Sequence, residues 1–539
     1  MEDAEFDAAV KRRFDRYMRM HPEFATFFGI HEYDHLLPEA TLKARREEIQ
    51  FFKDSLQEME QFPAQELSFE RSIDRDLMIR LLKLALFRDE VLNQWHKMTE
   101  APDTIGTALF LLFTREFAPF ETRLRSMSDR IDKIPKLLEE SKELVGEPVK
   151  LWNEVALESS ERLPGFLQLI LHSAKTVVKD QDFLQTLNLR VEKATAALMA
   201  YNSWLRNDIL PKGSGQYWIG ENNFLQLIAL RELGLMPDEI LTMGEKYLTE
   251  MRREREWYAE KVLPGEPVEK ALEFVKSKHP KDFQEALSLY RDSMNKAKEF
   301  IRTRDLATLP PNERLVVIET PVFLRHVIPF AAYMAPAKFD KERLGIYVVT
   351  PPEKPELIKN HNYADISNVS VHEAYPGHHM QLSWATENPS LPRVLSDATE
   401  LVEGWAFYCE QMMKEQGYDE SPENRLVQTN DLVWRAVRII VDVRLHKGEL
   451  SFEEAVEFLV KETMMPRESA IAEVKRYTFT PGQPLSYLLG KHQILQLRES
   501  IQRRMGPGFS LKFFHDTLLQ AGTMPIPFVE RVFEHKLST

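Results

Sequence analysis

The sequence predicts an all-α protein with a small β element. Apolar side chains recur at helical spacing along most of the 539 residues. Two short runs near the middle of the chain are instead rich in β-branched residues, and prolines border both of them. Proline and glycine divide the remainder into segments of helical length, with no internal repeat and no low-complexity linker. A small sheet within a helical protein accounts for all three observations.

The first 303 residues are expected to be helical. Apolar residues from Phe6 to Tyr17 follow the helical period, and His21-Pro22 ends that helix. Residues 150–206 are expected to form two helices with Leu163-Pro164-Gly165 between them, because proline lacks the backbone donor that a helix interior needs. Further helices are expected at residues 40–58, 70–98, 126–144, 237–261 and 282–303.

Two strands are expected over residues 314–319 and 345–350. The edge of such a sheet could pair with an extended peptide, although a purely structural hairpin is equally compatible with the pattern. After Asn362 the chain is expected to be helical to its end. We therefore expect a helical lobe over residues 1–310 and a second lobe, with the strands and most of the candidate site residues, over residues 311–539.

Composition excludes several classes of protein. With 43% apolar residues the chain can build a large core, and a net charge of −14 argues against nucleic acid or an anionic membrane as the main partner. One cysteine, Cys409, excludes an intrachain disulfide and fits a reducing compartment. The acidic N-terminus lacks the apolar core of a secretory signal, and no run approaches 18 apolar residues. We expect a soluble cytoplasmic protein, and a homodimer is compatible with the sequence.

The most informative stretch is a histidine cluster at residues 371–381. Three of the 15 histidines, His372, His378 and His379, fall within eight residues and lie next to Glu373. Imidazoles beside a carboxylate are typical of a zinc site with a general base. In the H-E-x-x-H motif, however, the second histidine stands at i+4, and here that position is Pro376.

A kinked helix would resolve this spacing. In a straight helix His378 would lie about 9 Å along the axis and about 240° around from His372, too far for one ion. Pro376 and Gly377 would let about two residues loop out, so that His378 takes the place one turn after His372. His372 and His378 would then bind zinc, with Glu373 facing the bound water. The alternative is a hydrogen-bonded helix end without metal.

Glu403 is the candidate third ligand. It lies 25 residues after His378 on the next expected helix, and Gly404 beside it would allow close helix approach. Glu400 or Glu410, on a similar face, could orient a ligand histidine. A solvated acidic stripe is the alternative, but the apolar neighbours of Glu403 disfavour a fully exposed helix.

Further candidates lie nearer the C-terminus. Arg438 and His446 share one face of a helix and could bind a substrate carboxylate or an oxyanion, although an ordinary helix ion pair between Arg438 and Asp442 is the simpler interpretation. The phenol of Tyr487 could donate to an oxyanion, and Arg498 lies three turns further on nearly the same face. Tyr477, which opens the same segment, is a further candidate for substrate binding.

Together these segments resemble the domain-of-unknown-function 885 family, whose members are helical zincin-like proteins. The matching segments are His21 to Asp34, His372-Glu373 to His379, Glu403-Gly404-Trp405-Ala406, Asp442 to His446 and Pro481-Gly482-Gln483 to Gly490. The resemblance implies a fold similar to neurolysin, angiotensin-converting enzyme and the Taq-type carboxypeptidase, in which two helical lobes flank a deep channel with zinc at its floor. It also implies that His378 rather than His379 is the second ligand.

The resemblance implies a zinc-dependent peptidase that cleaves short peptides, as a carboxypeptidase or an oligopeptidase. His372, His378 and Glu403 would hold zinc, and Glu373 would take the proton of the attacking zinc-bound water. Tyr487, with His446, would bond the oxyanion, and Arg438 or Arg498 would bind a terminal carboxylate. Two alternatives remain open: a metal-dependent amidase or esterase for a small non-peptide substrate, and a helical peptide-binding scaffold without catalysis.

Overall fold

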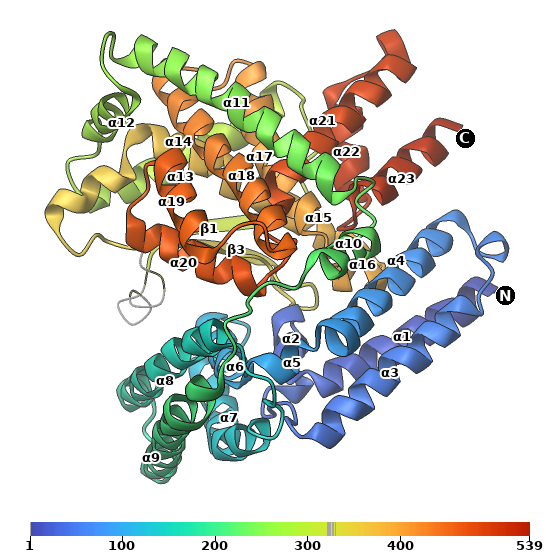
Figure 1. Cartoon of the computed structure of the whole chain (residues 1–539), viewed down its shortest axis with the longest axis vertical. Coiled ribbons are helices and arrows are strands. Elements are labelled where there is room, and N and C mark those ends of the chain that lie inside the picture. Colours follow the sequence, from blue (N-terminus) through green and yellow to red (C-terminus); the bar gives the residue numbers. More distant parts are fainter. Residues whose placement is uncertain (1, 321–324, 326–327, 329, 539) are drawn as a thin grey trace. The chain divides into compact units, whose positions relative to one another are not determined.

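The computed structural model of the chain describes residues 2–320, 325, 328 and 330–538 (Figure 1). Two compact units divide the chain. The first contains Met1–Trp218 and Ala337–Glu342, and the second contains Ile219–Pro336 and Arg343–Thr539. The division that we expected after residue 310 therefore falls inside the second unit.

The first unit is helical. Its core is built where helices pack in pairs, notably α8 on α9, α7 on α9 and α3 on α4. His31 attaches the returning segment 337–342, because its two ring nitrogens lie 2.8 Å from Asp34 Oδ2 and 2.8 Å from Asp340 Oδ1. The helices of this unit are α1 (Glu2–Met20), α2 (Pro22–Phe28), α3 (Leu42–Glu60), α4 (Phe69–Leu86), α5 (Gln94–Lys97), α6 (Ala101–Thr114), α7 (Phe120–Ser141), α8 (Lys150–Val177) and α9 (Gln181–Trp204).

The expected helix break at Leu163-Pro164-Gly165 was wrong. Helix α8 runs through Pro164, and the chain turns only between α8 and α9. The neighbours Leu163, Phe166 and Leu167 are all buried. Packing of this apolar face outweighs the backbone hydrogen bond that proline removes, so the helix continues.

The second unit carries the candidate site. Its most extensive helix contacts are between α11 and α18 and between α17 and α21. As expected, the chain after Asn362 is helical apart from short connections. The helices are α10 (Glu221–Leu230), α11 (Pro237–Val262), α12 (Val268–Ser277), α13 (Phe283–Thr303), α14 (Tyr363–Glu373), α15 (His378–Glu387), α16 (Leu391–Leu395), α17 (Thr399–Glu415), α18 (Pro422–Lys447), α19 (Phe452–Thr463), α20 (Arg467–Phe479), α21 (Ser486–Met505), α22 (Leu511–Gln520) and α23 (Ile526–Ser538).

A three-stranded sheet precedes α14 in the described part of the chain, with strand order β1-β3-β2. Both expected strands are confirmed as β1 (Arg314–Glu319) and β3 (Leu344–Val349), but they are parallel and so do not form a hairpin with each other. A third strand, β2 (Ala331–Met334), was not predicted from the sequence and pairs antiparallel with β3. This strand has four residues and no β-branched side chain, so its extended form depends on pairing with β3.

Helices α17 and α21 approach closely at two glycines. A Cβ atom on Gly490 would lie 1.7 Å from the carbonyl oxygen of Glu400, and one on Gly404 would lie 2.4 Å from the carbonyl carbon of Gly490. No side chain fits at either position. The expectation that Gly404 allows close helix approach is confirmed, and this contact sets the position of its neighbour Glu403.

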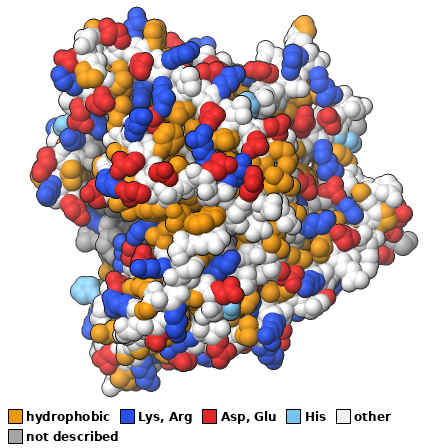
Figure 2. Space-filling model, in the orientation of Figure 1, with side chains coloured by type: hydrophobic (Ala, Val, Ile, Leu, Met, Phe, Trp, Pro, Cys, Tyr) orange, Lys and Arg blue, Asp and Glu red, His pale blue; other side chains and the backbone are white. Residues whose placement is uncertain are grey.

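The surface carries charges of both signs. On the face shown in Figure 2, Lys and Arg side chains are interspersed with Asp and Glu side chains. Within the residues that the structure describes, no helix combines the length and apolarity needed to cross a membrane.

Candidate metal centre

The histidine cluster lies at a junction of two helices. Helix α14 ends at Glu373, directly after His372, and α15 begins at His378. The backbone N–H of Gly377 donates to the carbonyl of Val371 at 3.1 Å, which turns the chain back toward the end of α14. A Cβ atom on Gly377 would lie 1.8 Å from the carbonyl oxygen of His372, so only glycine fits here. The expected bulge within one helix is thus corrected to a complete break between two helices.

This junction brings two imidazoles to one carboxylate. His378 Nε2 lies 3.5 Å from Glu403 Oε2, and His372 Nε2 lies 3.8 Å from the same oxygen. The ligand atoms of His372, His378 and Glu403 all lie within 4.8 Å of one another. Two ligand atoms bound about 2.0–2.1 Å from a tetrahedral ion would be about 3.4 Å apart. The three side chains therefore converge closely enough to share one ion after small adjustments.

Glu410 fixes the orientation of His372. His372 Nδ1 lies 2.8 Å from Glu410 Oε1, and because a carboxylate only accepts hydrogen bonds, Nδ1 carries the proton. The other ring nitrogen, Nε2, is then free to act as a ligand on the side of Glu403. The other acid that we considered for this role, Glu400, instead accepts a hydrogen bond from Arg231 at 2.8 Å.

The electrostatics of the group suit a cation. Burial opposes a charge on His372, but hydrogen bonds to Glu403 and Glu410 outweigh it and raise the pKa of His372 to about 10. Burial likewise opposes a charge on Glu403, yet His372 and His378 hold the pKa of this carboxyl well below its usual range. The group thus attracts positive charge, and a divalent ion can supply this charge in place of the imidazole protons.

Glu373, the expected general base, is the last residue of α14 and is partly buried. Among the described residues its carboxylate has no hydrogen-bonded partner, unlike Glu403 and Glu410. A carboxylate that is next to a ligand histidine and not engaged elsewhere remains available to a water molecule.

His379 has a different environment from its neighbour His378. It is fully buried, with Nε2 2.8 Å from Glu313 Oε2 and Nδ1 3.0 Å from the hydroxyl oxygen of Tyr333 on β2. Both ring nitrogens therefore have partners away from Glu403. As expected, it is His378 that the structure brings to the group.

Aromatic and cationic side chains adjoin the group. The ring of Phe407 packs against His372 at 4.8 Å and against Tyr487 at 6.2 Å. The guanidinium of Arg435 lies over the rings of Phe407, at 4.7 Å, and Trp434, at 4.2 Å. Tyr487 accepts a hydrogen bond from Gln483 at 3.3 Å. Tyr487 thus lies one aromatic ring away from His372.

The other predicted site residues lie in structural contacts. His446 is fully buried and donates from Nε2 to the carbonyl of Tyr477 at 3.0 Å, and burial lowers its pKa to about 4. This neutral, enclosed ring cannot reach a substrate, so its expected oxyanion contact is corrected. Arg498 is held by Glu415 at 2.9 Å and lies over the ring of Tyr408.

Arg438 and Tyr477, which we expected to bind substrate, instead contact the carboxylate of Glu473. Arg438 Nε donates to the Tyr477 hydroxyl at 2.9 Å, and that hydroxyl donates to Glu473 Oε2 at 2.7 Å. Both side chains are buried, and Arg438 also pairs with Glu473 directly at 3.0 Å. The structure therefore places them behind Glu473 rather than as direct substrate contacts.

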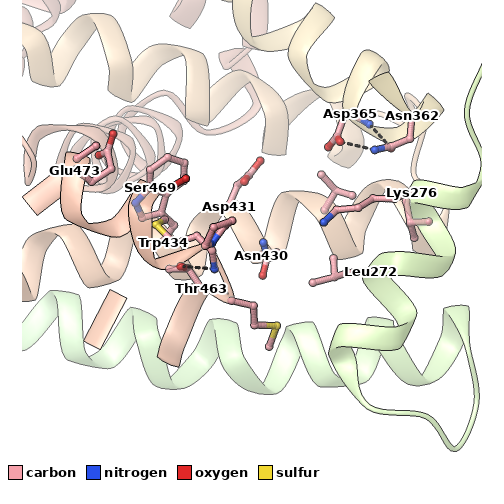
Figure 3. A pocket seen from close by; sticks show the side chains of 16 residues that line it. Leu272, Lys276, Asn362, Asp365, Asn430, Asp431, Trp434, Thr463, Ser469 and Glu473 are labelled. Atoms are coloured by element: carbon pink, nitrogen blue, oxygen red, sulfur yellow. Dashed lines mark hydrogen bonds between the residues drawn. The ribbon is translucent and has the colours of Figure 1, made fainter. Parts of the chain in front are cut away.

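Glu473 lies at the wall of a pocket of about 570 Å³ in the second unit. Residues of α12, α14, α18 and α20 line it, together with the connection from α19 to α20. In Figure 3, Asn430 and Asp431 of α18 lie between Leu272 and Lys276 of α12 on one side and Trp434 and Ser469 on the other. The charged lining residues are Lys276, Asp365, Asp431 and Glu473.

Arg435 and Asp431 were not predicted from the sequence as site residues. Both stand on α18, the helix that we singled out for Arg438 and His446. The available signal was their spacing, because Asp431 and Arg435 are one helical turn apart and Arg435 follows Trp434 directly. Whether Arg435 or Arg438 faces the site depends on how α18 is rotated about its axis. Successive residues of a helix point about 100° apart, so the sequence alone does not determine which of the two arginines faces the site.

The fold and the site together define a class of protein. It is a helical protein in which a His-His-Glu group lies beside a glutamate at the end of a helix. The chain belongs to the family described as "Bacterial protein of unknown function (DUF885)", whose model matches residues 22–532. The predicted membership is confirmed.

Two solved structures share the fold. A proposed lipoprotein of unknown function from Shewanella oneidensis is 24% identical, with a TM-score of 0.80 over 98% of this chain and 99% of that one. A second proposed lipoprotein, from Colwellia psychrerythraea, is 18% identical, with a TM-score of 0.85 over 100% of this chain and 99% of that one. No curated protein matches the chain.

Proposed function

We propose that the protein is a zinc-dependent peptidase that hydrolyses short peptides, as a carboxypeptidase or an oligopeptidase. The observation that carries the proposal is the convergence of His372, His378 and Glu403, with Glu373 directly after the first histidine. Two imidazoles and one carboxylate are a ligand set that catalytic zinc sites use, with a fourth position left for water or substrate.

Zinc bound here would supply Lewis acidity, which makes water a nucleophile near neutral pH and polarises a carbonyl. His372 and His378 would hold the ion through Nε2, and Glu403 through a carboxylate oxygen. Glu410 would keep His372 in the tautomer that metal binding needs. Each of these roles uses an orientation that the side chain already has.

The remaining steps fall to Glu373 and Tyr487. The Glu373 carboxylate takes a proton from the attacking water and later passes it to the leaving amine, so one group serves as base and then as acid. The phenol of Tyr487, which accepts from Gln483, can donate its own proton toward the developing oxyanion. His446 takes no part in this proposal because it is enclosed.

Two other functions use the same features. A metal-dependent amidase or esterase would need the same ligand set and base, and a peptide-binding scaffold would need the pocket without the chemistry. The unengaged Glu373 favours an enzyme, because a pure scaffold gains nothing from a carboxylate with no described partner beside a metal group. The peptidase is favoured over the esterase by the edge strands of the sheet, which an extended peptide could join.

The test combines metal analysis with peptide digestion. The purified protein should bind one zinc per chain, and mass spectrometry of a peptide mixture should show shortened products that a chelator abolishes. Simple esters and acyl amides are assayed in parallel. Stoichiometric zinc together with intact peptides and cleaved esters would reject the peptidase in favour of the second function.

A further inference from the structure

An arginine with unused donors lies one ring away from the metal group. The guanidinium of Arg435 is enclosed by Phe407 and Trp434, and its Nε and Nη1 atoms are buried without a hydrogen-bond partner. An Asp431 carboxylate oxygen lies 3.9 Å from Nη1, an ion-pair distance but too long for a hydrogen bond. Buried guanidinium donors without acceptors are costly, and a carboxylate is the ligand that satisfies them best.

The spacing suits the end of a peptide. Phe407 lies next to both the metal group and Arg435. Its ring is 4.8 Å from the ring of His372 and 4.7 Å from the Arg435 guanidinium. One residue of extended chain spans about 3.3–3.6 Å. His372 and Arg435 are no further apart than their two distances to the Phe407 ring combined. A metal contact of about 2.0–2.2 Å and a charge-assisted hydrogen bond of about 2.8 Å add to the reach of one extended residue. A peptide whose scissile carbonyl lies at the metal group can thus bring its terminal carboxylate within reach of Arg435.

Asp431 is the least engaged of the pocket carboxylates, because its ion pair with Arg435 is long, at 3.9 Å. Its side chain keeps 40% of its surface exposed, and among the described residues it accepts no hydrogen bond from another side chain. Glu473 is instead paired with Arg438 and Arg476, and Asp365 is bonded to Asn362. Lys276, the positive lining residue, stands on α12, across the pocket from α18.

The pocket lies next to Arg435, because Asp431 and Trp434 of the same helix line it. Asp365, a lining residue on α14, stands two turns before His372, so the pocket also adjoins the helix that carries the first histidine. A long, flexible side chain with an apolar stem and a charged end can curve along these walls toward Asp431. Apolar residues such as Leu272, Trp434 and Met464 line the walls for the stem, and a volume of about 570 Å³ accommodates it.

We propose that the site recognises the C-terminal residue of a peptide, with its carboxylate at Arg435 and a lysine or arginine side chain in the pocket against Asp431. This inference rests on the proposed peptidase function and narrows it to a carboxypeptidase for basic residues. Hydrolysis adds one water across the last peptide bond, and the products are free lysine or arginine and a peptide shortened by one residue.

The first experiment compares four peptides that differ only at the end: C-terminal Arg, Leu, Glu, and Arg blocked as an amide. With the zinc-loaded protein we expect kcat/KM for Arg to exceed that for Leu at least 10-fold, and the amide to be at least 100-fold slower than the free acid. Asp431→Asn should bring the ratio of Arg to Leu down toward one, and Arg435→Lys should bring the ratio of acid to amide down. Asp238→Asn, at a surface carboxylate that is 82% exposed, is the matched control and should keep both ratios.

The second experiment measures binding without turnover. Calorimetry of the zinc-loaded Glu373→Gln protein should detect L-arginine, with at least 10-fold weaker binding of L-leucine and of argininamide, and Asp431→Asn should lose the preference for arginine. Cleavage of all free-acid peptides at similar rates, or ratios unchanged by both pocket variants, would overturn this inference and leave the peptidase intact. Absence of any peptide cleavage would overturn the peptidase, and calorimetry would then decide about the pocket by itself.

Discussion

His372 Nδ1 lies 2.8 Å from Glu410 Oε1, and this hydrogen bond determines which nitrogen of the ring faces Glu403. The bond links α14 to α17, which are also the helices that carry the first histidine and the glutamate of the proposed metal group. The orientation of the His372 ring and the position of the proposed metal group therefore depend on the same two helices, α14 and α17.

Glu410→Gln should weaken zinc binding by about 10–100-fold. The amide can still accept from Nδ1, but it removes the negative charge that makes the imidazole a better ligand. Competition with a chelator measures the affinity. Glu415→Gln, on the same helix but paired with Arg498, is the control and should bind zinc like the unmodified protein. Equal affinities for all three proteins would remove Glu410 from the metal site.

His378→Ala should lower the zinc content well below one per chain, because His378 is one of the three proposed ligands. His379→Gln should keep about one zinc per chain, since that ring is bonded to Glu313 and Tyr333. Metal analysis of both variants, after circular dichroism has confirmed their folding, makes the comparison. Loss of zinc from a folded His379→Gln protein, with zinc kept in His378→Ala, would exchange the two assignments.

Glu373→Gln should retain zinc but lose peptide hydrolysis by about 100- to 10,000-fold in kcat, the usual contribution of a general base. Metal analysis and a peptide assay on the same preparation measure both properties. Glu387→Gln, at the end of α15, where Glu387 pairs with Arg343, is the control and should keep its rate. A kcat within a factor of three of the unmodified protein would exclude Glu373 as the base.

Gly490→Ala should destabilise the protein by at least about 3 kcal/mol, because a new methyl group meets the backbone of Glu400 rather than a movable side chain. Thermal unfolding measures the change. Gly508→Ala, where no atom lies within 4 Å of the added Cβ, is the matched control and should unfold within a degree or two of the unmodified protein. Equal melting temperatures for both variants would contradict the close contact between α17 and α21.

Asp431→Asn should raise the melting temperature, and the gain should be larger at pH 8 than at pH 4.5. The surrounding protein removes water from the Asp431 carboxyl and raises its pKa to about 7, although 40% of the side-chain surface is exposed. Arg435 opposes this shift, and Glu410 and Asp365 add to it. A carboxyl whose pKa is raised on folding costs stability once pH exceeds its unfolded pKa, about 3.9, and the full cost is reached above about 7. Calorimetric scans at both pH values test the sign, and a gain that is larger at pH 4.5 would refute the shift.

The sequence by itself was sufficient for the helical class, both longer strands and the three side chains that converge in the proposed metal group. Periodicity and proline boundaries are local signals, and local signals predict elements well. His372, Glu373, His378 and Glu403 were identified because their residue types and their order suit one chemistry. Their convergence, by contrast, needed the turn at Gly377 and the close packing of α17 on α21.

Only the tertiary structure decided which of the remaining polar residues face the site. His446, Arg438 and Arg498 are held by buried partners that no local pattern indicates, while Arg435 was overlooked although it lies against Phe407. Helix α8 continued through Pro164 for the same reason. A local pattern specifies which residues can share a helix face, but burial and pairing depend on segments distant in the chain, and these are set only when the helices pack.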